Sequence, residues 1–119
     1  MFKLFNNNPH TEKLSDCVCR AISKATGANY YDVMDLLALN SQQNDCECLN
    51  VECYSKMLDD IGYESKNGEG RTVGQIAEEH KDKVLLLRLE GHLTCAEKGD
   101  VYDLWDTTDK VVDKFWIVS

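Results

Sequence analysis

The strongest constraint on the fold of this chain is a change in its hydrophobic pattern near Lys83. Before that residue, apolar side chains recur at helical spacing, whereas after it short apolar and alternating runs predict β-strands. Helices that precede a block of strands are typical of an α+β protein, because an α/β sheet requires the two kinds of element to alternate. With 119 residues, the chain is expected to form a single domain over residues 1–119.

The N-terminal part is predicted to be a series of helices that follows an extended segment over residues 1–13. Residues that commonly begin or end helices bound each apolar stripe. The predicted helices are residues 14–26 with Ser15 as N-cap and Gly27 as stop, a helix that begins at the Asn29 cap, a helix from the Asn50 cap to Gly62, and a short helix opened by a Thr72–Gln75 capping box. Residues 40–48 and 63–71 lack periodicity and are predicted to be loops.

The C-terminal part is predicted to form an antiparallel sheet. Its strands are expected at residues 84–89, 92–97, 101–106 and 114–118. The run Val84–Leu89 is apolar throughout, which favours a strand that is covered on both faces. Lys98-Gly99 is suited to a two-residue hairpin turn between the second and third of these strands.

His92 stands at the mouth of this predicted hairpin, close to two carboxylates. A two-residue turn places Thr94 opposite Asp103 and His92 opposite Trp105, so that Asp103 shares a face with His92. A turn one residue longer places Asp106 opposite His92 instead. In either register a carboxylate can hold the imidazole in one tautomer, as a general base requires, and Trp105 can shield that contact from water.

Cys17 lies in the first turn of the helix predicted over residues 14–26. Unpaired backbone N–H groups and the positive end of the helix dipole stabilise a thiolate there, which lowers the thiol pKa below its ordinary value of about 8.5. A nucleophilic cysteine is often built in this way, whereas most free cysteines are small apolar core residues.

Cys17, His92 and a carboxylate together are the parts of a nucleophilic Cys-His-Asp site. His92 would take the thiol proton, and Asp103, or alternatively Asp106, would orient the ring. The oxyanion that forms in such a reaction needs hydrogen-bond donors. The backbone N–H of Cys17 and a side-chain amide of the N-terminal segment, for which Asn8 is the candidate, would supply them.

The order of these parts resembles the papain-like cysteine peptidase superfamily. More narrowly, NPHTEKLSDCVCRAI (residues 8–22), GHLTCAEKGDVYDLWDTTD (residues 91–109) and FWIV (residues 115–118) are similar to small papain-fold proteins of Gram-positive bacteria and their phages. The resemblance implies a papain-like α+β fold, with N-terminal helices packed on a C-terminal antiparallel sheet. It implies Cys17 as nucleophile, His92 as base, a peptide or protein substrate, and no cofactor or metal.

The resemblance bears on the acid in two ways. Asp103-Leu104-Trp105 resembles the polar-x-Trp arrangement of papain-like enzymes and favours Asp103. Transglutaminase-like and bacteriocin-processing relatives place an acid further from the histidine, which suits Asp106. The glutamine that papain-like enzymes carry shortly before the cysteine is absent, because Thr11 stands there.

Composition limits the partners of the chain. The formal net charge of −8 disfavours binding to nucleic acid, because phosphate contacts require clustered Lys and Arg. No apolar run approaches the roughly 18–20 residues that a membrane span requires, and the N-terminus carries no secretory signal pattern. A cytoplasmic location and six reduced cysteines are therefore expected. The oligomeric state is left open.

Two other classes of function compete with the hydrolase. One is a non-catalytic binding protein that keeps the same fold and engages a host partner through its acidic surface. The other is a zinc or redox protein built on Cys46, Cys48 and Cys53, together with Cys17, Cys19, Cys95 and the three histidines. The single residue between Cys46 and Cys48 disfavours zinc, because structural sites usually separate paired cysteines by about two to four residues.

Overall fold

The structure is a computed structural model that describes residues 1–6, 16–47 and 50–119. The described residues form four helices and six strands, so the fold class is α+β, as predicted. The helices are α1 (Cys17–Thr26), α2 (Tyr30–Asn44), α3 (Val51–Ile61) and α4 (Val73–Glu79). The strands are β1 (Phe2–Leu4), β2 (Glu64–Asn67), β3 (Val84–Leu89), β4 (His92–Glu97), β5 (Asp100–Asp103) and β6 (Lys114–Ile117).

The strands form one mixed sheet in the order β1-β5-β4-β3-β6-β2. All pairs are antiparallel except β1 and β5, which run parallel. The prediction of a purely antiparallel sheet confined to the C-terminal part is therefore wrong. It missed β1, in the predicted lead-in, and β2, in the predicted loop 63–71. Both are edge strands, and all four residues of β2 are exposed, so they carry no buried apolar pattern.

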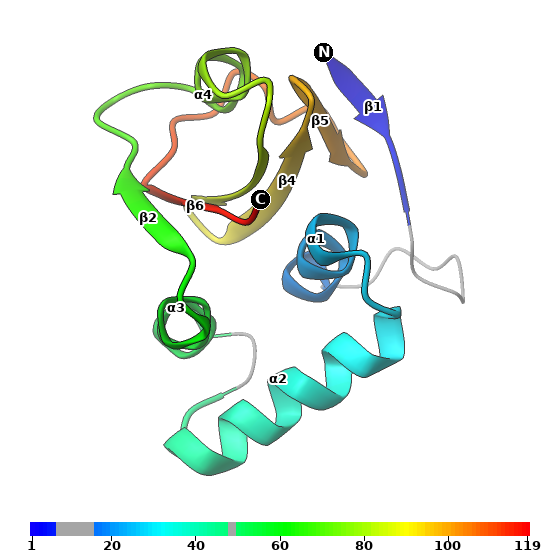
Figure 1. The fold of residues 1–119 in the computed structure, drawn as a ribbon, viewed down its shortest axis with the longest axis vertical. Coiled ribbons are helices and arrows are strands. Elements are labelled where there is room, and N and C mark those ends of the chain that lie inside the picture. Colours follow the sequence, from blue (N-terminus) through cyan, green and yellow to red (C-terminus); the bar gives the residue numbers. More distant parts are fainter. Residues whose placement is uncertain (7–15, 48–49) are drawn as a thin grey trace.

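Helices cover both faces of the sheet. In Figure 1, α1, α2 and α3 lie on one side of the strands and α4 lies on the other. Strand β3 contributes to both cores: Leu86 packs with the α1–α3 side, whereas Leu85 and Leu87 pack with the α4 side. Strand β3 is therefore buried on both faces, as its continuous apolar run predicted.

The helix boundaries follow local capping chemistry. Asn29 and Asn50 cap α2 and α3 as predicted, and Thr72 with Gln75 forms the predicted capping box of α4. Helix α2 continues through Asn44, past the predicted loop start, and the buried Asn40 amide donates to the carbonyl of Cys53. Of the helices in the described part of the chain, none combines the length and the apolar character needed to cross a membrane.

A disulfide joins Cys46 to Cys53. The expectation that all six cysteines are reduced is therefore wrong for this pair, and these two residues are bonded to each other instead of forming a metal cluster. The physical reason is the turn between α2 and α3. Asp45 ends α2 in the left-handed conformation and Asn50 begins α3, which brings the two cysteine Cα atoms to 5.8 Å, within the range that a disulfide requires.

Candidate active site

The β4–β5 hairpin determines which carboxylate faces His92. Lys98 and Gly99 form a two-residue turn with φ values of 54° and 81°, as a type I′ turn requires. The strand pairing that follows from this turn joins Cys95 to Tyr102, so that the next residue of β5, Asp103, comes on the same face as His92, while β5 ends before Trp105. The two-residue turn is therefore confirmed, and the alternative register with a longer turn is wrong.

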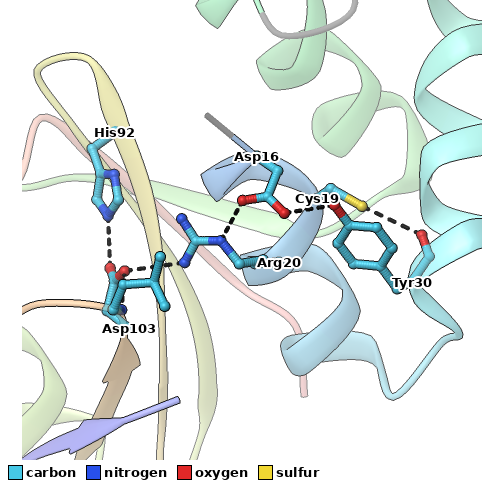
Figure 2. A network of polar contacts seen from close by, with 7 residues as sticks. Asp16, Cys19, Arg20, Tyr30, His92 and Asp103 are labelled. Atoms are coloured by element: carbon cyan, nitrogen blue, oxygen red, sulfur yellow. Dashed lines mark hydrogen bonds and ion pairs between the residues drawn. The ribbon is translucent and has the colours of Figure 1, made fainter. Parts of the chain in front are cut away.

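His92 is bonded to Asp103. Nε2 of His92 lies 2.6 Å from Oδ2 of Asp103, and the two side chains are only 11% and 2% exposed (Figure 2). The ring of Trp105 lies 5.1 Å from the imidazole, centre to centre, and partly covers it. Asp106 is exposed, and its carboxylate accepts hydrogen bonds from Thr108. The structure thus brings Asp103, and not Asp106, to the histidine.

Cys17 reaches the same histidine from α1. This helix begins at Cys17, with Asp16 as its N-cap, and packs along β4; Ser15, the predicted cap, lies outside the described residues. The half-buried side chain of Cys17 and the imidazole of His92 line the same cleft, and the nearby His92 side chain and Leu93 backbone lower the pKa of the thiol. Because Nε2 of His92 is bonded to Asp103, Nδ1 is the ring nitrogen left for the thiol.

The pKa shifts of the three groups have consistent directions. Burial alone raises the pKa of Cys17, but the hydrogen bonds from His92 and Leu93 and the charges of His92 and Arg20 hold it below its usual value. Burial alone lowers the pKa of His92, but the contacts with Asp103 and Cys17 raise it to about 9. Burial alone raises the pKa of Asp103, but the contact with His92 holds this pKa below its usual range. These directions favour the charged form of each group: a thiolate at Cys17, an imidazolium at His92 and a carboxylate at Asp103.

A cleft of about 540 Å³ opens beside the cysteine–histidine pair. It is lined by Cys17, Val18, Val51, Tyr54, Leu89, Glu90, Gly91, His92 and Asp113. A second hollow of about 320 Å³ lies against the Trp105 side of the histidine and is lined by Leu89, Glu90, His92, Trp105, Lys110 and Val111. The imidazole of His92 therefore borders both spaces.

Three polar residues behind the site were not identified from the sequence. Asp16, Arg20 and Tyr30 are buried; Arg20 and Tyr30 both donate hydrogen bonds to the Asp16 carboxylate, and Arg20 also contacts Asp103. A signal was present: Asp16 and Arg20 lie four residues apart and share one face of α1, adjacent to Cys17. Their partners lie on α2 and β5, which the spacing does not reveal.

The other free cysteines of the described residues differ from Cys17. Burial raises the pKa of both Cys19 and Cys95 to about 12, so they remain protonated thiols near neutral pH. The Cys19 thiol donates to the carbonyl of Tyr30. Among the residues that the structure describes, no three His, Cys, Asp or Glu side chains gather as metal ligands would. Asn8, the candidate oxyanion donor, lies outside the described residues.

The side chains that the structure brings together are Cys17, His92 and Asp103, with Arg20 behind the carboxylate. They come from α1, β4 and β5, three elements that the chain order separates widely. Comparisons of the chain with protein-family models, with curated proteins and with solved structures found no match.

Proposed function

We propose that this chain is a small cysteine hydrolase that cleaves a peptide bond or another amide bond through a thioester on Cys17. The observation that carries the proposal is the position of His92. One ring nitrogen is bonded to the buried Asp103 at 2.6 Å, and the thiol of Cys17 lines the same cleft as the ring, close enough that each group shifts the pKa of the other. This is the arrangement that activates a thiol nucleophile.

In the first half of the reaction, the thiolate of Cys17 attacks the carbonyl carbon of the bound amide. The carbonyl oxygen gains the negative charge, and collapse of this intermediate breaks the carbon–nitrogen bond. The imidazolium of His92 gives its proton to the leaving amine. The products are a free amine, a thioester on Cys17 and a neutral imidazole, whose ring Asp103 keeps in place.

In the second half, neutral His92 takes a proton from a water molecule as the oxygen attacks the thioester carbonyl. The carbon–sulfur bond breaks, the carboxylic acid leaves, and Cys17 returns to the thiolate that pairs with the imidazolium. An amine that replaces the water would give acyl transfer with the same residues. Hydrolysis and transfer thus share one site, and the acceptor distinguishes them.

The start of α1 supports an oxyanion-binding role for backbone amides. Asp16 is the N-cap residue, yet its side chain makes no capping hydrogen bond, because its carboxylate contacts Arg20 and Tyr30 instead. The first-turn amides, including that of Cys17, are therefore not satisfied by this cap. We assign the Cys17 amide as one oxyanion donor and keep Asn8 as the proposed second donor.

The topology supports a papain-like fold for this hydrolase. A cysteine at the start of the first helix is followed by further helices and then by a histidine and an acid on neighbouring strands of the sheet. The two hollows on either side of His92 fit a substrate that extends past the scissile bond in both directions, as a peptide or protein segment does. Glu90 and Asp113 border the cleft and disfavour a nucleic acid substrate.

A labelling experiment tests the proposal directly. Brief treatment with iodoacetamide near neutral pH, followed by mass spectrometry, should modify Cys17 well before Cys19 and Cys95, because only Cys17 has a lowered pKa among these three. The variant His92→Ala should slow the labelling of Cys17 and leave the other two rates unchanged.

A cleavage experiment completes the test. The protein is incubated with a diverse peptide library, and new termini are identified for the wild type, for Cys17→Ala and for the matched control Cys95→Ala. We expect new termini with the wild type and with Cys95→Ala only. Equal labelling of all three cysteines, together with no Cys17-dependent termini, would show that the hydrolase proposal is wrong. A biological effect that survives Cys17→Ala would identify a binding protein instead.

A further inference from the structure

A buried polar cluster contacts Asp103 through the carboxylate oxygen that does not contact His92. It consists of Asp16, Arg20 and Tyr30, which are 7%, 8% and 6% exposed. Figure 2 shows the Arg20 side chain extending from α1 between the carboxylates of Asp16 and Asp103. A charged side chain in such a position is costly unless its partners compensate it, so its presence calls for a physical reason.

The contacts join three elements. Nε of Arg20 donates to Oδ1 of Asp16 at 2.6 Å, and Nη1 of Arg20 donates to Oδ1 of Asp103 at 3.4 Å. The hydroxyl of Tyr30 donates to Oδ2 of Asp16 at 2.5 Å. Arg20 therefore connects α1 to β5, while Tyr30 connects the Asp16 carboxylate to α2.

The two oxygens of Asp103 have separate tasks. Oδ2 contacts Nε2 of His92 at 2.6 Å. Oδ1 accepts the backbone N–H of Leu104 at 2.7 Å and the guanidinium of Arg20. Rotation of the carboxylate away from His92 would break the contacts on Oδ1, so these donors hold the orientation in which Oδ2 faces the imidazole.

We propose that Arg20, held in place by Asp16 and Tyr30, is a positioning residue that fixes the Asp103 carboxylate in the orientation that contacts His92. Arg20 also lies one helical turn after Cys17 on α1. The same side chain therefore sets the nucleophile's helix against the strand that carries the acid. The catalytic consequence rests on the proposed hydrolase function, whereas the effect on His92 does not require turnover.

Charged and titratable groups outside the cluster also lie near it, on the elements packed around it. They are Cys17, Cys19 and Lys24 on α1, His92, Cys95 and Glu97 on β4, and Tyr102 on β5. Lys24 is engaged elsewhere, because it pairs with Glu97 at 2.6 Å and lies over the ring of Tyr102. Among the described residues, Arg20 is thus the cation that contacts Asp103 in addition to the imidazolium of His92.

The test is the pKa of His92, measured by NMR of its ring nitrogens in the intact protein. Loss of the Arg20 charge alone would raise this pKa, because one nearby cation disappears. Loss of the carboxylate contact would lower it. The proposal predicts that Arg20→Gln lowers the pKa of His92 from about 9 by about one unit or more, with a mixture of ring tautomers. Arg20→Lys should give a smaller fall.

Two further variants control for folding and for charge. The double variant Asp16→Asn with Arg20→Gln removes both members of the buried pair together, leaves no unpaired charge at position 16, and should show the same fall. Arg71→Gln removes a guanidinium that pairs with Glu79 and should leave the pKa of His92 unchanged. Circular dichroism identifies the variants that are folded.

A kinetic measurement adds a second readout. At a pH about one unit below neutral, the labelling of Cys17 by iodoacetamide should slow about tenfold in Arg20→Gln, because a less basic His92 supports less thiolate. An unchanged or raised pKa of His92 in the folded single or double variant overturns the positioning role. A lowered pKa in a protein that cleaves no peptide supports the positioning role and refutes only the hydrolase proposal.

Discussion

Replacing Asp103 with asparagine removes one charge at the centre of the proposed site and nearly preserves the side-chain volume. Burial alone lowers the pKa of His92, yet the Asp103 and Cys17 contacts raise it from 6.5 to about 9. That rise of about 2.5 units corresponds to about 3 kcal/mol in favour of the imidazolium. Because the Asp103 carboxylate contacts the ring directly, we expect it to supply most of this rise, so that Asp103→Asn lowers the pKa of His92 by about two units. The ratio of the thiolate–imidazolium pair to the neutral pair then falls about a hundredfold.

The ultraviolet absorbance of the thiolate reports this ratio. Each protein is titrated next to its own Cys17→Ser counterpart, so that the difference belongs to Cys17 alone. The wild type should show the Cys17 thiolate near neutral pH, and Asp103→Asn should have lost most of it. The matched control is Asp106→Asn, because the exposed Asp106 carboxylate bonds Thr108 and does not reach His92. A full thiolate signal in Asp103→Asn, or its loss in Asp106→Asn, would refute the assignment of Asp103.

Three further predictions concern stability. Gly68→Ala should destabilise the fold by about 3 kcal/mol in urea unfolding, because a Cβ atom there would lie 1.8 Å from the carbonyl oxygen of Val112; an unchanged midpoint would contradict this. Reduction of the Cys46–Cys53 disulfide should cost about 2 kcal/mol and lower the melting temperature, and a variant with serine at both positions should no longer respond to reductant. The pKa of His92 rises from 6.5 to about 9 on folding, so the protonated ring stabilises the fold fully below about pH 6.5, and this contribution is lost as the pH rises through about 9. The difference in the free energy of unfolding between the wild type and His92→Gln, measured by urea titration, should therefore become smaller toward alkaline pH. A difference that becomes larger would contradict the reasoning.

Local chemistry accounts for the parts of the fold that the sequence predicted well. The caps of α2 and α3 are asparagines whose side chains accept hydrogen bonds from amides two residues later, an interaction that needs no distant partner. The hairpin turn at Lys98-Gly99 also depends on neighbouring residues only. It fixed the register, which in turn selected Asp103 as the neighbour of His92.

Long-range pairing accounts for the parts that the sequence did not predict. Strand β1 pairs with β5 through residues almost a whole chain length away, and its burial pattern carries no alternation that would reveal it. The disulfide depends on how α2 and α3 turn toward each other, so the spacing of Cys46 and Cys53 alone did not distinguish it from reduced thiols.

The candidate site shows the same division. The pattern predicted that Cys17 lies at the start of a helix and that His92 faces an acid, but it could not predict that α1 packs along β4. The role of Arg20 was equally hidden, because a charged residue in a helix is usually read as solvent-facing. Its burial is visible only once β5 lies beside α1.

The covalent link between α2 and α3 has a consequence for any assay of this protein. Helix α3 supplies Val51 and Tyr54 to the wall of the cleft, and Cys53 sits between them in the sequence. A reductant added to keep the Cys17 thiol free of oxidation also attacks the bond that anchors this wall. Substrate preference recorded with and without reductant therefore describes two differently tethered clefts.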